Sequence, residues 1–244
     1  MFAILQFSDT NTILRQPKIQ SERFNLPSGD AFFTVTADKH LGKIPWKKLE
    51  SCLGILKNNM ILPYGMTIPD GINITAFTPE VLPQLLLMNS ATDYIRKHKL
   101  HFQSKSLTIF DETAVCQSYI EKLLPCFKNI KIITDLPKAY GSLSRTLLQK
   151  YGFSLIVSED EAYTDDVIIT HKCTVPIYYE GTVFTNEKKY LMNSTVYSGN
   201  DIDLPDLYES IRPENADKVL FASVLYEKCK ETSLGKLQYR SFGC

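Results

Sequence analysis

The sequence predicts an α/β protein whose second half is built on a parallel β-sheet. After residue 105 the pattern alternates strand, helix, strand, helix, strand, which is typical of a parallel sheet with right-handed crossovers. Of the 244 residues, 44% are hydrophobic and 22% are charged. This composition is ordinary for a globular chain that buries a core, and it argues against disorder or low complexity.

The second half divides into short apolar runs and amphipathic segments. Two helices are expected, at about 113–127 and 141–151. The glycine at position 152 suits the C-terminal end of the second helix. A third helix, over 217–227, is apolar enough to be buried against the sheet. The strands are expected at 106–110, 130–134, 153–157 and 167–170, with shorter ones at 177–179 and 181–184.

The first half is less regular. Thr78 is a plausible N-cap with Pro79 in the first turn of a helix that should run to about Lys99. The polar stretch from 8 to 30 predicts no element. Other expected elements are strands at 1–7, 31–36 and 59–63 and a helix at 44–56. We place a boundary near residue 104, between a mixed α/β domain (1–104) and a parallel-sheet domain (105–244).

Charge and cysteine content exclude several classes of function. Twenty-seven basic residues balance 27 acidic ones, so we predict no nucleic-acid partner. No apolar stretch is long enough to span a bilayer and the start lacks a basic region, which predicts a cytoplasmic protein without a membrane partner. Homo-oligomerisation stays open. No two of the six cysteines are closer than ten residues, so we expect reduced, mostly buried thiols and no zinc site.

Polar side chains follow the expected parallel strands at their carboxyl ends, where open α/β sheets bind ligands. Candidate binding residues are Asp111, Glu112, Thr113, Asp135 and Ser158. Glu159, Asp160 and His171 lie at the same edge.

Residues 105 to about 185 resemble a Rossmann-type domain, such as those of amino-acid and shikimate dehydrogenases. The resemblance rests on the order of the elements and on Asp135, which follows Asp111 by 24 residues. It implies an NAD(P) cofactor, with its pyrophosphate at the loop 111–116 and its ribose held by Asp135. This loop, however, reads Asp-Glu-Thr-Ala-Val-Cys. Without glycine and with two carboxylates, it disfavours NAD(P), because those charges would face the phosphates.

Two further alternatives concern phosphate and metal. Residues 107–113 resemble the first motif of haloacid-dehalogenase-type phosphatases and the opening strand of response-regulator receivers. Thr113 stands where the phosphatase has its general acid, and Val157-Ser158 where a receiver has its phosphoacceptor. The acidic run 159–166 has oxygen ligands suited to magnesium or calcium, although it lacks EF-hand spacing and we favour a solvated loop.

We therefore predict a Rossmann-like α/β protein with a non-catalytic role in binding, assembly or regulation. The alternative is an NAD(P)-dependent oxidoreductase with an unconventional nucleotide loop. The backbone at 111–116 separates these two hypotheses. Carboxylates that fill the loop favour the first, whereas outward-facing N–H groups favour the second.

Overall fold

The computed structural model describes residues 1–12, 18–40, 43–100, 102–159, 165–171, 175–176, 178–187, 191 and 193–243. The chain forms two compact units. The first contains Met1–Pro79 and Leu204–Leu234, and the second contains Glu80–Asp203 and Gly235–Cys244.

The first unit is built on a four-stranded mixed sheet with the strand order β2-β3-β1-β4. Strand β1 is parallel to both β3 and β4, and β2 adds antiparallel to the outer side of β3. The strands are β1 (Phe2–Thr12), β2 (Ile19–Asn25), β3 (Ala31–His40) and β4 (Met60–Ile61). Strand β2 lies in the polar stretch where no element was expected, because an exposed edge strand needs no apolar alternation.

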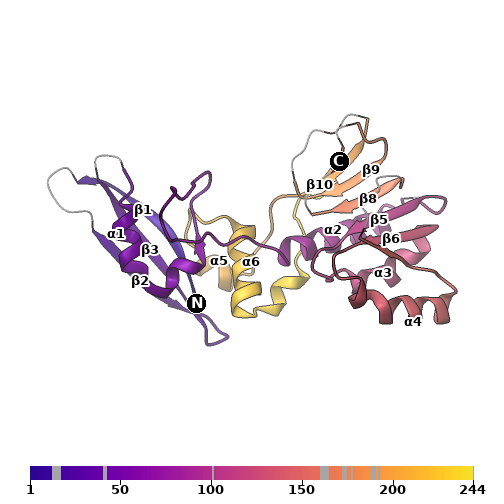
Figure 1. The fold of residues 1–244 in the computed structure, drawn as a ribbon, viewed down its shortest axis with the longest axis horizontal. Helices are drawn as coiled ribbons and strands as arrows, with labels where there is room; N and C mark the ends of the chain where they lie inside the picture. Colours follow the sequence, from indigo (N-terminus) through magenta and orange to yellow (C-terminus); the bar gives the residue numbers. More distant parts are fainter. Residues whose placement is uncertain are drawn as a thin grey trace. The chain divides into compact units, whose positions relative to one another are not determined.

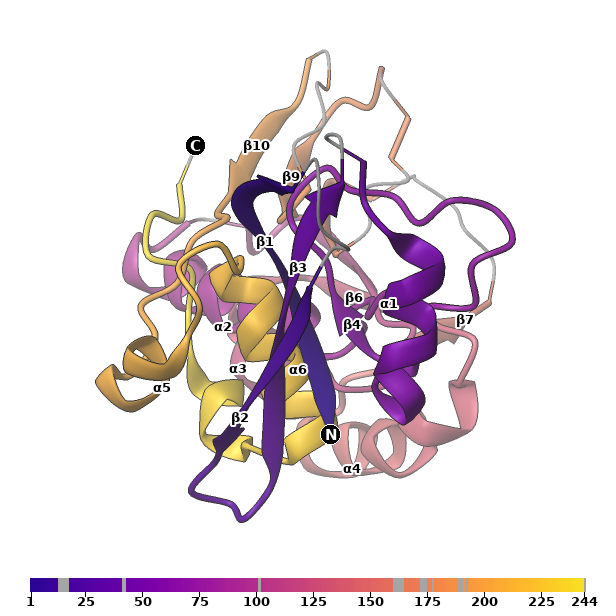
Figure 2. The ribbon, with the colours of Figure 1, turned by 90° about the vertical axis from the view of Figure 1, so that its left-hand side faces the viewer.

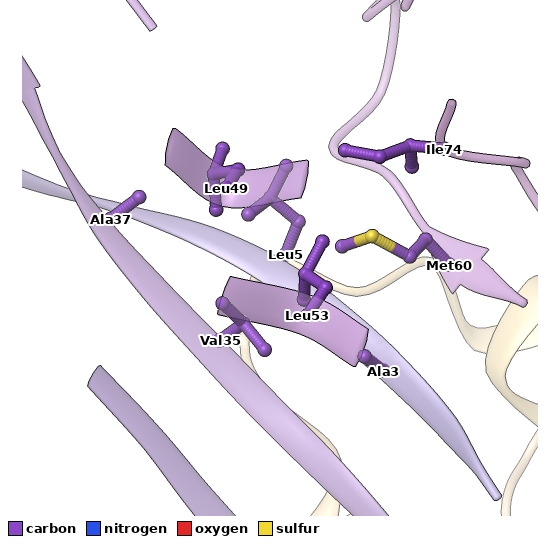
Figure 3. Packing of buried hydrophobic residues seen from close by; sticks show 8 residues of the cluster. All are labelled: Ala3, Leu5, Val35, Ala37, Leu49, Leu53, Met60 and Ile74. Carbon is purple, nitrogen blue, oxygen red and sulfur yellow. The ribbon is translucent and has the colours of Figure 1, made fainter. Parts of the chain in front are cut away.

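Side chains alternate between two buried faces of this sheet. One face packs against helix α1 (Trp46–Leu53), which the 3-10 turn η1 (Gly54–Asn58) follows. Leu49 and Leu53 of this helix meet Leu5 of β1 and Val35 of β3, as Figure 3 shows. Cys52 of the same helix is exposed, whereas the sequence predicts mostly buried thiols.

The opposite face packs against helix α6 (Lys218–Cys229), which follows α5 (Asp206–Ile211). Figures 1 and 2 show α1 and α6 on opposite sides of β1 and β3. The Phe221 ring meets Phe32 and Phe2 edge-on, with centroid distances of 5.6 and 6.5 Å. The prediction that this helix packs on the parallel sheet is therefore wrong. Its apolar surface fits either sheet, and periodicity alone does not say which.

The second unit contains a six-stranded sheet in which every pair is parallel. The order β7-β6-β5-β8-β9-β10 corresponds to the 3-2-1-4-5-6 order of doubly wound dinucleotide-binding folds. The predicted Rossmann-like fold class is confirmed. The strands are β5 (Ser106–Phe110), β6 (Asn129–Ile133), β7 (Ile156–Ser158), β8 (Val167–Thr170), β9 (Thr182–Thr185) and β10 (Thr195–Ser198).

The helices of this unit are α2 (Leu82–Lys97), α3 (Gln117–Leu123) and α4 (Gly141–Tyr151), with 3-10 turns η2 (Leu124–Cys126) and η3 (Pro137–Tyr140). Right-handed crossovers that step in one direction place α3 and α4 on the same face, and α2 packs beside α3, β8 and β9 (Figure 1). Gly152 caps α4 with φ 64°, as predicted. Helix α2 begins at Leu82 without a side-chain cap, so the expected Thr78 cap is wrong.

The other face of the parallel sheet is covered by the connections that follow β8 and β9. Val175, Tyr179 and Leu191 pack there against Ile168 and Val183. Of the expected strand 177–179, residue 177 lies outside the described residues, and Tyr178 and Tyr179 are not in a strand.

The two compact units differ from the predicted division at residue 104. Helix α2 belongs with the parallel sheet, and residues 204–234 belong with the first sheet. That residues 105–244 fold as a domain of their own stays a prediction. Within the ranges described, no helix combines the length and the apolar character that a membrane span requires.

Replacing Phe221 with alanine should lower the free energy of unfolding by about 3–5 kcal/mol, because it empties a site between two buried aromatic rings. The measurement is urea unfolding followed by circular dichroism. Leu207→Ala is the control, since this leucine on α5 is 51% exposed and should change stability by less than about 0.5 kcal/mol. Equal effects of the two substitutions would contradict the placement of α6.

Candidate functional site

The strand order defines where a ligand would bind. Strands β5 and β8 are neighbours, but β5 continues through α3 to β6, whereas β8 continues to β9 on the other side. In such sheets the crevice between the diverging connections is the usual ligand site. The loop that begins at Asp111 and the residue His171 flank this point.

The carboxylate of Asp111 is completely buried and accepts hydrogen bonds from its own loop. One oxygen lies 3.2 Å from the amide nitrogens of both Thr113 and Val115, and the other lies 2.7 Å from that of Cys116. The Tyr140 hydroxyl also donates to the second oxygen. Asp111 is therefore surrounded by donors and has no exposed oxygen that could attack a phosphoryl group.

The backbone of the loop explains how so many amides converge on one side chain. Ala114 adopts the left-handed conformation with φ 57°, which turns the chain back over Asp111 at some cost in strain. Helix α3 consequently begins only at Gln117, four residues later than the sequence predicts. The amides that would face a bound phosphate in a glycine-rich loop face the protein's own carboxylate instead.

Neighbouring side chains complete this buried polar group. The Gln84 amide of α2 donates to the Phe110 carbonyl at 2.9 Å and to the Cys116 sulfur at 3.3 Å. Burial, followed by the negative charge of Asp111, raises the pKa of the Cys116 thiol. Burial also raises the pKa of Tyr140, and the negative charge of Asp111 raises it further. Both groups therefore stay protonated, and the Tyr140 hydroxyl remains a donor to the carboxylate.

The other candidate residues are arranged less tightly. Thr113 donates its hydroxyl to Asp111 at 3.4 Å, whereas Glu112 and Asp135 are exposed. The Ser158 carbonyl accepts the amide of Thr134 at 3.0 Å, so Ser158 lies beside the end of β6. The structure thus joins Asp111 and Thr113 in one group, while Glu112 and Asp135 face solvent. Asp160 lies outside the described residues.

Metal binding finds no support in the parts of the chain that the structure describes. No group of three or more His, Cys, Asp or Glu side chains there could hold an ion. Of the acidic run, residues 160–164 lie outside these parts. Asp165 accepts the Thr108 hydroxyl, and Asp166 accepts the Ser106 amide at 3.0 Å. These two carboxylates tie the connection before β8 to β5.

A second polar group lies beyond β8 and β9. The Asn186 amide oxygen is 3.0 Å from Nδ1 of His171, and the amide nitrogen donates to the Tyr239 hydroxyl at 3.0 Å. Tyr239 is buried, and its backbone N–H donates to Ser90 of α2 at 2.9 Å. The Ser90 hydroxyl of this group is buried and donates to the Leu86 carbonyl at 2.8 Å, so it is not available as a nucleophile.

Sequence reasoning missed Gln84, Tyr140, Asn186 and Tyr239. Gln84 had a usable signal, because a polar residue within an apolar helix needs a buried partner. The other three had none. Their roles depend on elements distant in the sequence.

No protein-family model and no curated protein sequence matches the chain. L-tryptophan dehydrogenase from Nostoc punctiforme is a similar solved structure, with 9% identity over 87% of this chain and 68% of that chain and a TM-score of 0.36. A chorismate mutase/shikimate 5-dehydrogenase fusion protein from Clostridium acetobutylicum has 12% identity over 67% and 73%, with a TM-score of 0.30. With scores this low, the fold assignment rests on the strand order itself.

Replacing Asp111 with asparagine should lower the free energy of unfolding by about 3 kcal/mol, because an amide N–H₂ would then face buried N–H donors. Asp135→Asn is the matched control and should cost less than about 0.5 kcal/mol, since this carboxylate is exposed. Urea unfolding of both variants tests this. A loss below about 1 kcal/mol for Asp111→Asn would contradict the buried-acceptor role.

The raised pKa of Tyr140 predicts a loss of stability at alkaline pH. Unfolded tyrosine loses its proton near pH 10, whereas folded Tyr140 keeps it. The contribution of Tyr140 to the free energy of unfolding is therefore complete below pH 10 and falls as the pH rises above it. At pH 11 the loss should be about 1.4 kcal/mol, and Tyr140→Phe should abolish this part. Tyr64→Phe, at a fully exposed position, should behave like the wild type. If the free energy of unfolding of Tyr140→Phe and of the wild type changed identically at alkaline pH, the prediction would be contradicted.

Proposed function

We propose that this chain is a non-catalytic Rossmann-like protein that acts in binding, assembly or regulation. In this proposal the carboxylate of Asp111 takes the place of a cofactor's phosphate. The observation that supports it is the set of hydrogen bonds from the Thr113, Val115 and Cys116 amides to a completely buried Asp111.

Electrostatics supports the exclusion of a dinucleotide from this position. A phosphate that used the same amides would lie about 4 Å from the carboxylate, where two like charges repel by about 4 kcal/mol at an effective dielectric of 20. Helix α3 has only seven residues, so the positive end of its dipole offers limited compensation. Displacing Asp111 would in turn leave a buried charge without its donors.

The alternative function is an NAD(P)-dependent oxidoreductase. It is favoured by the strand order β7-β6-β5-β8-β9-β10 and by the exposed Asp135 after β6, where a dinucleotide fold has its ribose-binding acid. In that case the pyrophosphate would have to bind without the backbone amides of the loop 111–116. A phosphoryl-transfer role is supported less, because Asp111 is inaccessible.

Neither NAD nor NADP at millimolar concentration should shift the melting temperature of the protein. A ligand present at 100 times its dissociation constant would stabilise the fold by about 2.7 kcal/mol, which a thermal-shift assay detects easily. An upward shift of several degrees that Asp135→Ala abolishes would contradict the proposal and would favour the oxidoreductase alternative. A shift that survives this substitution would also contradict the proposal, although it would place the nucleotide elsewhere.

A further inference from the structure

One edge of the six-stranded parallel sheet has no neighbouring strand in the part of the chain that the structure describes. This edge is β7, which pairs with β6 on its inner side. The opposite edge is different, because Ser198 of β10 forms an antiparallel bridge with Gly243. An unpaired edge presents backbone N–H and C=O groups to any strand that can approach it.

The pairing of β7 with β6 indicates which backbone groups point outward. The Ser158 carbonyl accepts the amide of Thr134 at 3.0 Å, so the backbone of Ser158 faces β6. Because consecutive residues of a strand alternate, the N–H and C=O of Ile156 also face β6. By the same alternation, those of Val157 and of the preceding Leu155 point away from the sheet. A further strand would bind these outward groups.

The segment lacks the charges and prolines that usually prevent edge pairing. Residues 153–158 read Phe-Ser-Leu-Ile-Val-Ser. The large apolar side chain of Ile156 is nevertheless 50% exposed. The edge strand β2 of the other sheet, in contrast, contains Glu22 and Arg23.

The polarity of this segment is the same in both directions from Ile156. Leu155 and Val157 flank it, and Ser154 and Ser158 come next. In an antiparallel pair centred on Ile156, each residue would therefore meet one of its own kind. Ile156 would face its counterpart as a non-hydrogen-bonded pair, and Leu155 would exchange two hydrogen bonds with Val157 of the other copy. A second copy of the chain thus matches both the backbone and the side chains.

Helix α4 adds an apolar surface beside the same edge. Its Lys150 lies 4.0 Å from Glu121 of α3, so this side of α4 faces α3 and not β7. Leu148 lies about 200° around the helix from Lys150, on the side toward β7, and is 57% exposed. Two such helices, each above its own β6 and β7, would lie about 10 Å apart, which is the distance of packed helices.

We propose that the chain forms a twofold-symmetric dimer in which β7 pairs antiparallel with β7 of a second copy, with the axis at Ile156. The Leu148 sides of the two α4 helices pack against each other beside the axis. This goes beyond the proposed function, since the pairing does not use the Asp111 group. A short strand pair with one helix flank per copy lies at the low end of the area that specific dimers bury, about 1,200 Å² in total. We therefore expect a dissociation constant in the micromolar range.

Charged residues surround this edge but do not join the two copies. Lys131 is the register neighbour of Ile156. Its counterpart would be three strand spacings away, about 14 Å, which exceeds the Debye length of about 8 Å. Lys150 faces α3, and Arg145 and Glu159 are exposed. Because no ion pair holds the dimer together, added salt should not weaken it.

Sedimentation velocity from about 1 to about 100 μM protein should show a concentration-dependent change from one chain to two. Ile156→Lys should raise the dissociation constant at least about tenfold, because two like charges would lie directly opposite each other. Ile55→Lys is the matched control, since this isoleucine of the first unit is 71% exposed and should leave association unchanged. Leu148→Gln, which leaves the strand intact, should raise the dissociation constant about fivefold.

A mixture of Ile156→Lys and Ile156→Glu distinguishes this pairing from association through another surface. Each variant alone should associate weakly, whereas the mixture should form a mixed dimer because opposite charges then meet at the axis. A monomer at every concentration would overturn the proposal and leave the edge to a partner of another kind. A dimer that salt dissociates, one that tolerates Ile156→Lys or Leu148→Gln, an equal effect of Ile55→Lys, or a mixture that does not associate would also overturn it. None of these outcomes depends on the nucleotide test.

Discussion

The hydrogen bonds that Asp111 accepts at the end of β5 determine the character of the parallel-sheet unit. A buried carboxylate is unfavourable unless donors surround it, and here three backbone amides and the Tyr140 hydroxyl supply them. To bring these amides inward, the chain adopts a left-handed residue at Ala114 and delays the start of α3. One side chain thus sets the loop conformation and the helix start, and in the proposed function it occupies the amides that a phosphate would use.

Elements with strong local patterns could be predicted from the sequence. Strands β5 and β8 and helix α4 have the predicted bounds, because apolar runs and a C-terminal glycine define them locally. Strands β2 and β10 were missed, since both are short or exposed edge strands whose pairing depends on distant residues. For the same reason the assignment of α6 to the parallel sheet failed, as two sheets offered equivalent apolar surfaces.

The candidate site was predictable in position but not in arrangement. The carboxyl ends of parallel strands meet at one edge, so Asp111 and Asp135 could be assigned to it from strand order. Their burial could not. Asp111 is completely buried and Asp135 exposed, a difference that depends on Tyr140 and on the loop backbone rather than on residue type.

The amide hydrogen exchange of Cys116, measured by NMR in the native protein, tests the role of Asp111 most directly. If the carboxylate holds this N–H at 2.7 Å, the amide should exchange as slowly as those of β5, because both open only with the structure around them. Exchange at the rate of an exposed loop, with β5 still protected, would contradict the account. The loop amides would then be accessible to a ligand phosphate.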